Sequence, residues 1–117
     1  MGARAILDEA HFRHMTGNDR ALQAEILMLF RAQAELWDRL LIPDAPLQTW
    51  SEAAHTLKGS ARGLGLWSLA DACEAAENMA EAGAIEGPQI HRALGRVRAE
   101  LHDALEALPI YEAANGA

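Results

Sequence analysis

The sequence predicts an all-α protein, an antiparallel four-helix bundle with a short additional N-terminal helix. Among its 117 residues are 25 Ala and 16 Leu, against two Phe and one Tyr. Ala and Leu lose little side-chain freedom in a helix, whereas aromatic and β-branched residues favour strands. Glycine and proline divide the chain into helical segments, and no segment shows the alternation typical of a strand. Four long helices with short connections are typical of such a bundle.

The first two helices meet at a turn over residues 16–18. A short helix is expected over residues 3–15, and a long one follows over 19–42. Asn18 or Asp19 can cap the long helix, because either side chain can accept a hydrogen bond from a free N–H group of the first turn. We expect its buried face to be the row with helical spacing, Leu22, Ile26, Leu29, Phe30, Gln33, Leu36, Trp37 and Leu40.

Proline and glycine also delimit the next two helices. Prolines interrupt the chain after the long helix, and a third helix is expected over residues 46–64. A fourth helix is expected over 66–82. Gly83 follows it, in the position where a left-handed residue commonly ends a helix.

The fifth helix begins at Gly87-Pro88, since proline is tolerated in the first turn, where its missing N–H has no partner to lose. We expect this helix to end before Pro109 and residues 110–117 to form a frayed tail. The whole chain, residues 1–117, is then a single helical-bundle domain.

Composition and charge exclude several classes of function. Ten basic and 17 acidic residues give a net charge of −7, and nucleic-acid binding needs clustered cations, so we expect no nucleic-acid partner. The longest apolar run, residues 26–30, is far too short to cross a membrane. The single cysteine, Cys73, rules out an intramolecular disulfide, and no secretory signal is apparent. We expect a monomeric cytoplasmic protein without membrane contact.

Residues 53–65 depart from this plain helical pattern. On a helix with about 100° per residue, one narrow stripe faces the core, formed by Ala54, Leu57, Ala61 and Leu64. A second arc, centred well away from that stripe, carries His55, Lys58, Gly59 and Arg62. The sequence therefore predicts a solvent-facing histidine in the middle of a long helix, one turn from the chain's only lysine.

Gly59 lies inside this helix, where glycine costs about 1 kcal/mol relative to alanine. Close packing against another helix is one explanation, although the residue lies on the solvent side. Access is the other: with no side chain four residues after His55, a large partner or a phosphoryl group can approach the ring. The sequence leaves both explanations open.

The segment His55-Thr-Leu-Lys-Gly-Ser resembles the signature of histidine-containing phosphotransfer (HPt) domains. That signature is H-x-L-K-G-[SA], a glycine ten residues after the histidine, and then a helix with Leu, Cys and an acidic or amide residue. The matching residues here are Gly65, Leu69, Cys73 and Glu77. The likeness covers residues 16–82, and the last helix matches only by its pattern.

This resemblance implies a phosphorelay intermediate of two-component signalling. The sequence has no Gly-rich phosphate-binding loop, and 117 residues leave no room for a kinase domain, so we expect no cofactor and no kinase domain of its own. It implies receiver domains of response regulators and a sensor histidine kinase as partners. His55 would carry the phosphoryl group through Nε2, Lys58 would stabilise its charge, and Gly59 would give the steric opening. Arg62 either helps to bind phosphate or an acidic receiver rim, or is an ordinary solvated residue.

Glu77 can also be placed by geometry. In a helical hairpin that turns near Leu66, residues equally distant from the turn face each other, and both His55 and Glu77 are eleven residues from it. A carboxylate there could accept a hydrogen bond from Nδ1 of His55 and leave Nε2 as the nucleophile. The alternative is an ordinary glutamate at the rim of the bundle.

Other residues favour structural roles. His11 and His14 have a spacing that could bind a metal, but no third ligand completes the set, so we expect no metal site. Cys73 fits a buried stripe as a small apolar residue. Surface positions are expected for His91 and His102, and packing positions in the core or at its ends for Trp37, Trp50 and Trp67.

Two alternative functions remain at this point. A dimerising phosphoacceptor domain of a histidine kinase has an acidic residue directly after its histidine, whereas this chain has Thr56. A helical adaptor that binds a receiver or kinase without being phosphorylated needs neither His55, Lys58 nor Gly59. The presence of all three favours the phosphorelay intermediate.

Overall fold

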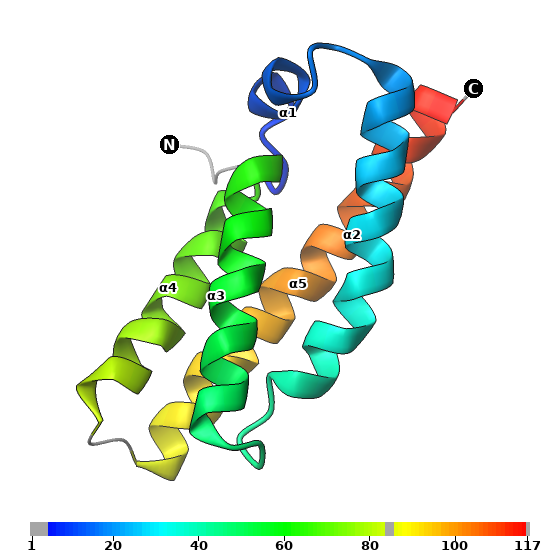
Figure 1. Ribbon diagram of the computed structural model, residues 1–117. Coiled ribbons are helices and arrows are strands. Elements are labelled where there is room, and N and C mark those ends of the chain that lie inside the picture. The colour runs from blue at the N-terminus through cyan, green and yellow to red at the C-terminus, as the bar shows by residue number, and fades with distance from the viewer. Residues whose placement is uncertain (1–4, 84–85, 117) are drawn as a thin grey trace.

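Five helices make up the part of the chain described by the computed structural model, residues 5–83 and 86–116. Four long helices alternate in direction along the bundle, α2 (Arg20–Leu40), α3 (Leu47–Leu64), α4 (Trp67–Ala82) and α5 (Gly87–Gly116) (Figure 1). The short α1 (Glu9–Met15) lies at the end where α3 meets α4. The predicted fold class is confirmed.

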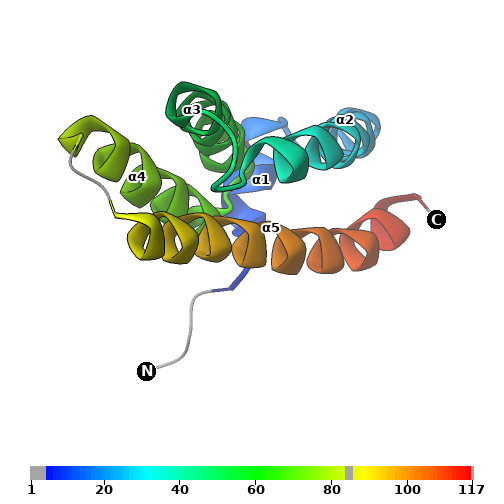
Figure 2. The same cartoon turned by 90° about the horizontal axis from the view of Figure 1, so that it is seen from below.

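Seen from below, α4, α3 and α2 form an arc, and α5 lies across its open side (Figure 2). α5 contacts α4 and α2, and α3 packs between its two neighbours. One apolar cluster fills the space between the helices and includes Trp37 and Trp50. Cys73 is fully buried within it, and burial raises the pKa of its thiol to about 12. The predicted packing role of these three residues is confirmed.

The first helix begins later than expected, and the second begins at the expected place. α1 begins at Glu9 rather than at residue 3, because Asp8 is its N-cap and accepts a hydrogen bond from the His11 N–H at 3.0 Å. Residues 1–4 lie outside the described part of the chain. Asp19 caps α2 through the Leu22 N–H at 3.1 Å, whereas Asn18 adopts a left-handed conformation with φ of 62°.

The predicted buried face of α2 is partly wrong. The residues that are buried are Gln23, Leu27, Phe30, Ala34 and Trp37, so Phe30 and Trp37 lie in the core as expected, but the centre of the buried face is about 80° around the helix from the centre of the expected row. Leu22, Leu29 and Leu36 are instead 39%, 55% and 50% exposed, and Gln33 is also exposed. α2 carries apolar residues around more than one face, and the face that packs in the core has Phe30 and Trp37 at its edge together with Leu27 and Ala34. The row with Leu22, Leu29 and Leu36 stays on the surface.

The expectation that the last helix ends before Pro109 is also wrong, since α5 continues to Gly116. Proline removes one helical hydrogen bond but fixes φ near the helical value, so the backbone can continue in the same conformation. The residues that follow, Glu112, Ala113 and Ala114, favour a helix.

Gly65 connects the α3–α4 turn to the start of the chain. It ends α3 in the left-handed conformation, with φ of 90°, and its carbonyl accepts a hydrogen bond from the Asp8 N–H at 2.9 Å. A Cβ atom at this position would lie only 3.0 Å from the Asp8 carbonyl oxygen. Both the conformation and this close approach require glycine.

We therefore expect Gly65→Ala to lower the free energy of unfolding by about 2 kcal/mol, measured by urea denaturation. Gly83→Ala is the matched control, because Gly83 also has a positive φ of 79° but meets no described atom within 4 Å. Its loss should be about 1 kcal/mol, from the conformation alone. Equal losses would contradict a role for the Asp8 contact.

Candidate functional site

His55 lies in the middle of α3, on the side away from the core, and its side chain is 71% exposed. The opposite face of the helix is buried through the predicted stripe, Ala54, Leu57, Ala61 and Leu64. The orientation expected for this histidine is therefore the one the structure has. An imidazole in this position is accessible to a macromolecular partner.

Glu77 of α4 lies where the hairpin geometry predicts it. Its Oε2 atom is 2.8 Å from Nδ1 of His55. A carboxylate oxygen can only accept, so Nδ1 carries the proton and donates the hydrogen bond. In the neutral ring this leaves the lone pair on Nε2, the atom that points away from Glu77.

Lys58 contacts the other oxygen of the same carboxylate. Its Nζ atom lies 2.8 Å from Oε1 of Glu77, and the two side chains are only 15% and 13% exposed. Burial opposes ionisation of Glu77, but the contacts from Lys58 and His55 outweigh it and hold the pKa of the carboxyl below its usual value. At neutral pH the ionised Glu77 therefore links Lys58 to His55.

Gly59 and Arg62 flank His55 along α3. A Cβ atom at Gly59 would meet no described atom within 4 Å, so close helix packing does not explain this glycine. The Arg62 guanidinium lies 3.3 Å from the Glu74 carboxylate, and both side chains are about half exposed. This pair lies nearer the α3–α4 turn and does not include Glu77, the partner of His55.

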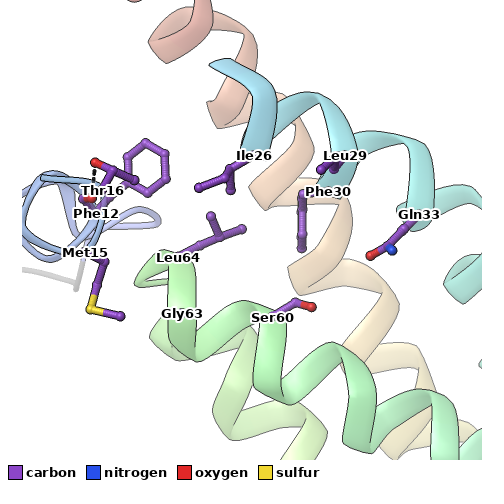
Figure 3. A pocket seen from close by; sticks show the side chains of 10 residues that line it. All are labelled: Phe12, Met15, Thr16, Ile26, Leu29, Phe30, Gln33, Ser60, Gly63 and Leu64. Carbon is purple, nitrogen blue, oxygen red and sulfur yellow. Dashed lines mark hydrogen bonds between the residues drawn. The ribbon is translucent and has the colours of Figure 1, made fainter. Parts of the chain in front are cut away.

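An apolar groove lies between α2, α3 and α1, and its α3 lining begins at Ser60, farther along the helix than His55. It has a volume of about 360 Å³ and is lined by Phe12, Met15, Thr16, Ile26, Leu29, Phe30, Gln33, Ser60, Gly63 and Leu64 (Figure 3). Ser60 and Gln33 lie toward one end, and the α1 residues lie at the other. His55, Gly59 and Gly63 are spaced by four residues, so they form one row on α3 that leads to the groove.

Comparisons with known proteins decide the family. A family model described as the Hpt domain matches residues 20–109. The chain belongs to the Hpt domain family. It is therefore a phosphorelay intermediate in two-component signalling. No curated protein gives a match to the sequence.

Two solved structures resemble this Hpt domain. The histidine phosphotransferase ShpA from Caulobacter crescentus is 35% identical, with a TM-score of 0.74 over 96% of this chain and 95% of that one. A rice protein assigned as a histidine-containing phosphotransfer protein is 20% identical, with a TM-score of 0.72 over 97% of this chain and 86% of that one. The second likeness concerns the fold alone.

The remaining histidines of this Hpt domain lie outside the cluster formed by His55, Lys58 and Glu77. His14, His91 and His102 are exposed, and His102 lies 3.5 Å from the Asp38 carboxylate. Within the described residues, no three His, Cys, Asp or Glu side chains are grouped to hold a metal, and no helix is long and apolar enough to span a membrane. His11 contacts backbone and Trp67 instead.

Sequence reasoning missed the groove and the exposed α2 row that borders it. The signal was present in α2, which has more apolar positions than one buried face can hold. It also missed the Lys58–Glu77 pair, because spacing within α3 says nothing about which α4 side chain a lysine reaches.

The pH dependence of stability tests the link through Glu77. Because its pKa is lowered on folding, the carboxylate stabilises the fold above its unfolded pKa of 4.5, and this contribution is lost as the pH falls through the folded value. We expect Glu77→Gln to lower the free energy of unfolding by about 1 kcal/mol at pH 7 and by less at pH 3, where protonation of the carboxyl is under way. Urea denaturation at both pH values measures this.

Glu74→Gln is the control for this prediction, since the Glu74 carboxylate is 48% exposed and pairs across the surface with Arg62. Its effect should be within about 0.5 kcal/mol at both pH values. A Glu77→Gln deficit that persists undiminished at pH 3 would mean that packing, and not charge, explains it.

Proposed function

We propose that His55 is the residue of this Hpt domain that carries the phosphoryl group, received from and returned to the aspartate of receiver domains. The observation that carries this proposal is the 2.8 Å contact between Nδ1 of His55 and Glu77, which leaves Nε2 free on an exposed ring. A nucleophile with its second ring atom held by a carboxylate follows the general pattern of an oriented base or nucleophile.

The reaction then has few steps. The Nε2 lone pair attacks the phosphorus of an aspartyl phosphate, the N–P bond forms, and the P–O bond to the aspartate breaks. The electron pair leaves with the aspartate, which becomes a carboxylate, while the proton on Nδ1 stays between His55 and Glu77. Return of the phosphoryl group to another receiver reverses these changes.

Lys58, Gly59 and Arg62 support this transfer in different ways. Lys58 keeps Glu77 ionised, and its ammonium, one turn from His55, also offsets the charge of the phosphoryl group. Gly59 leaves the approach to Nε2 open. Arg62 lies at the same surface. When its ion pair with Glu74 opens, its guanidinium can bind phosphate or acidic residues at the rim of the receiver.

We propose that the receiver covers the α2–α3 side of His55. The row His55, Gly59 and Gly63 ends at the apolar groove, which the exposed Leu29 of α2 also lines, and Leu36 is exposed two turns farther along α2. A partner whose aspartate reaches Nε2 can extend along this row over the groove, and burial of exposed leucines favours its association.

Cellular context is part of the same proposal. All of the side chains of the site come from one chain, so a monomer suffices for the transfer. The free Cys73 thiol is compatible with the reducing cytoplasm, where we place the protein and its sensor histidine kinase. The net charge of −7 disfavours nucleic acid as a partner.

The test is incubation of the protein with phosphorylated receiver domains, followed by chemical analysis of the label. We expect a phosphate on this chain that is acid-labile and stable to base, as an N–P bond is. Absence of label with every receiver that binds would identify a non-phosphorylated adaptor and would overturn the proposal. A label that resists acid would show phosphorylation of a hydroxyl group instead.

A further inference from the structure

A polar cluster outside the phosphorylation site fastens α1 to the turn between α3 and α4. Asp8 uses both carboxylate oxygens: Oδ1 accepts from the His11 N–H at 3.0 Å, and Oδ2 accepts from the Trp67 Nε1–H at 2.9 Å. These two hydrogen bonds, led by that from Trp67, hold the pKa of Asp8 below its ordinary value. The Asp8 N–H is bonded to Gly65 in addition.

His11 completes this cluster. Its ring packs edge-on against Trp67, with the ring centres 4.8 Å apart. Its Nε2 atom lies 3.1 Å from the Arg62 carbonyl oxygen, which can only accept, so Nε2–H donates. The first part of α1 is thereby bonded to the same helix that carries His55.

The other end of α1 is bonded to α2. Gln23, which is buried on α2, donates from Nε2 to Thr16 Oγ1 at 2.9 Å. The Thr16 hydroxyl in turn donates to the Phe12 carbonyl at 2.8 Å, the bond drawn in Figure 3. α1 is therefore a short bridge between α2 and the α3–α4 turn.

This bridge forms one wall of the apolar groove, through Phe12, Met15 and Thr16 (Figure 3). α1 has only seven residues, and an isolated helix of that length is not stable in water. Its position therefore depends on the contacts at its two ends. A shift of α1 would remove the wall and leave the floor formed by α2 and α3.

We propose that the Asp8–His11–Trp67 cluster is a positioning device for receiver docking: it keeps α1 in place and so sets receiver affinity, with no part in the chemistry at His55. This inference rests on the proposed function, because its occupant is the receiver that we place over the α2–α3 side of His55. When only a fraction of the molecules have α1 in place, the apparent dissociation constant rises in inverse proportion to that fraction.

Asp8→Asn tests the proposal in the full chain. His11 and Trp67 donate to different oxygens of Asp8, and asparagine replaces one of these oxygens with an NH₂ group, so one of the two donors then faces another donor. We expect the KM for a receiver and its Kd in a binding titration to rise about tenfold, because one hydrogen bond to a charged group is lost. The maximal transfer rate should stay unchanged, and hydrogen exchange of α1 amides should accelerate.

Labelling by phosphoramidate separates docking from chemistry. In that reaction Nε2 attacks phosphorus, the P–N bond breaks and ammonia leaves, so no receiver is needed. Asp8→Asn should be labelled as fast as the wild type. Slower labelling would overturn the proposal, because the cluster would then act on His55 itself. Unchanged KM and Kd together with faster α1 exchange would also overturn it.

Asp38→Asn is the matched control, since Asp38 is likewise bonded to a distant residue, with Arg98 Nε 3.0 Å from its Oδ1, but it joins α2 to α5. It should leave receiver KM and Kd unchanged. Trp67→Phe, which keeps an aromatic ring and removes the donor, should reproduce the KM and Kd effect of Asp8→Asn. If the wild type binds receivers but takes no label, the proposed phosphotransfer is contradicted. The Kd values of the variants still test the positioning role in that case.

Discussion

Replacement of His55 by glutamine is expected to abolish phosphorylation of this protein by receivers and by phosphoramidate alike. Glutamine has no lone pair on nitrogen that can attack phosphorus, although it keeps a polar side chain of similar length. The side chain of His55 is 71% exposed, so the free energy of unfolding should change by no more than about 0.5 kcal/mol. Radiolabelling and urea denaturation measure the two effects.

The other four histidines provide the controls for this result. His14, His91 and His102 are exposed and lie outside the His55–Glu77–Lys58 cluster, whereas His11 is engaged with the Arg62 carbonyl. Single glutamine variants at these positions should be labelled like the wild type by phosphoramidate. Residual label on the His55 variant, located at any of them, would contradict the assignment of a single phosphorylated residue.

The sequence predicted the α3–α4 hairpin well because two simple rules apply there. Helical periodicity separates the buried stripe of α3 from the arc with His55, and equal distances from Leu66 bring Glu77 opposite His55. Neither rule depends on side-chain detail. The Lys58–Glu77 contact does, since a lysine one turn from the histidine can extend toward either neighbouring helix.

α2 shows where periodicity alone fails. Its apolar residues lie around more than one face, and more than one row satisfies helical spacing. Which row is buried depends on how α2 is rotated against α3 and α5, and that rotation follows from packing of Phe30 and Trp37 in the core. The row with Leu22, Leu29 and Leu36 was expected inside and lies outside, so the groove could not be predicted.

The cluster around α1 was missed for a different reason. His11 was considered as half of a metal pair with His14, because their spacing was the only information at hand. Its partners are the Arg62 carbonyl and Trp67, which lie 51 and 56 residues farther along the chain. Contacts between residues so far apart in sequence leave no repeating pattern in the chain. They can therefore be identified only in the folded structure.

Gly59→Gln should stabilise the protein and slow its phosphotransfer. Glycine in an exposed helix costs about 1 kcal/mol relative to good helix formers, so the melting temperature should rise by about 4 °C. The new side chain meets no described atom of the bundle, and it extends over the path between His55 and the groove. A docked receiver must then shift, and a misplacement of about 1 Å can slow transfer about a hundredfold.

Gly95→Gln separates the two effects. Gly95 lies inside α5 and is exposed, and a Cβ atom at this position would also meet no described atom within 4 Å. Its replacement should raise the melting temperature by a similar amount while transfer keeps its normal rate. Phosphoramidate labelling of Gly59→Gln should fall much less than receiver transfer, because the small donor needs less room than a protein domain. If Gly59→Gln transfers as fast as Gly95→Gln, the open surface beside His55 does not serve docking. That result would contradict the proposal that the receiver covers the α2–α3 side of His55.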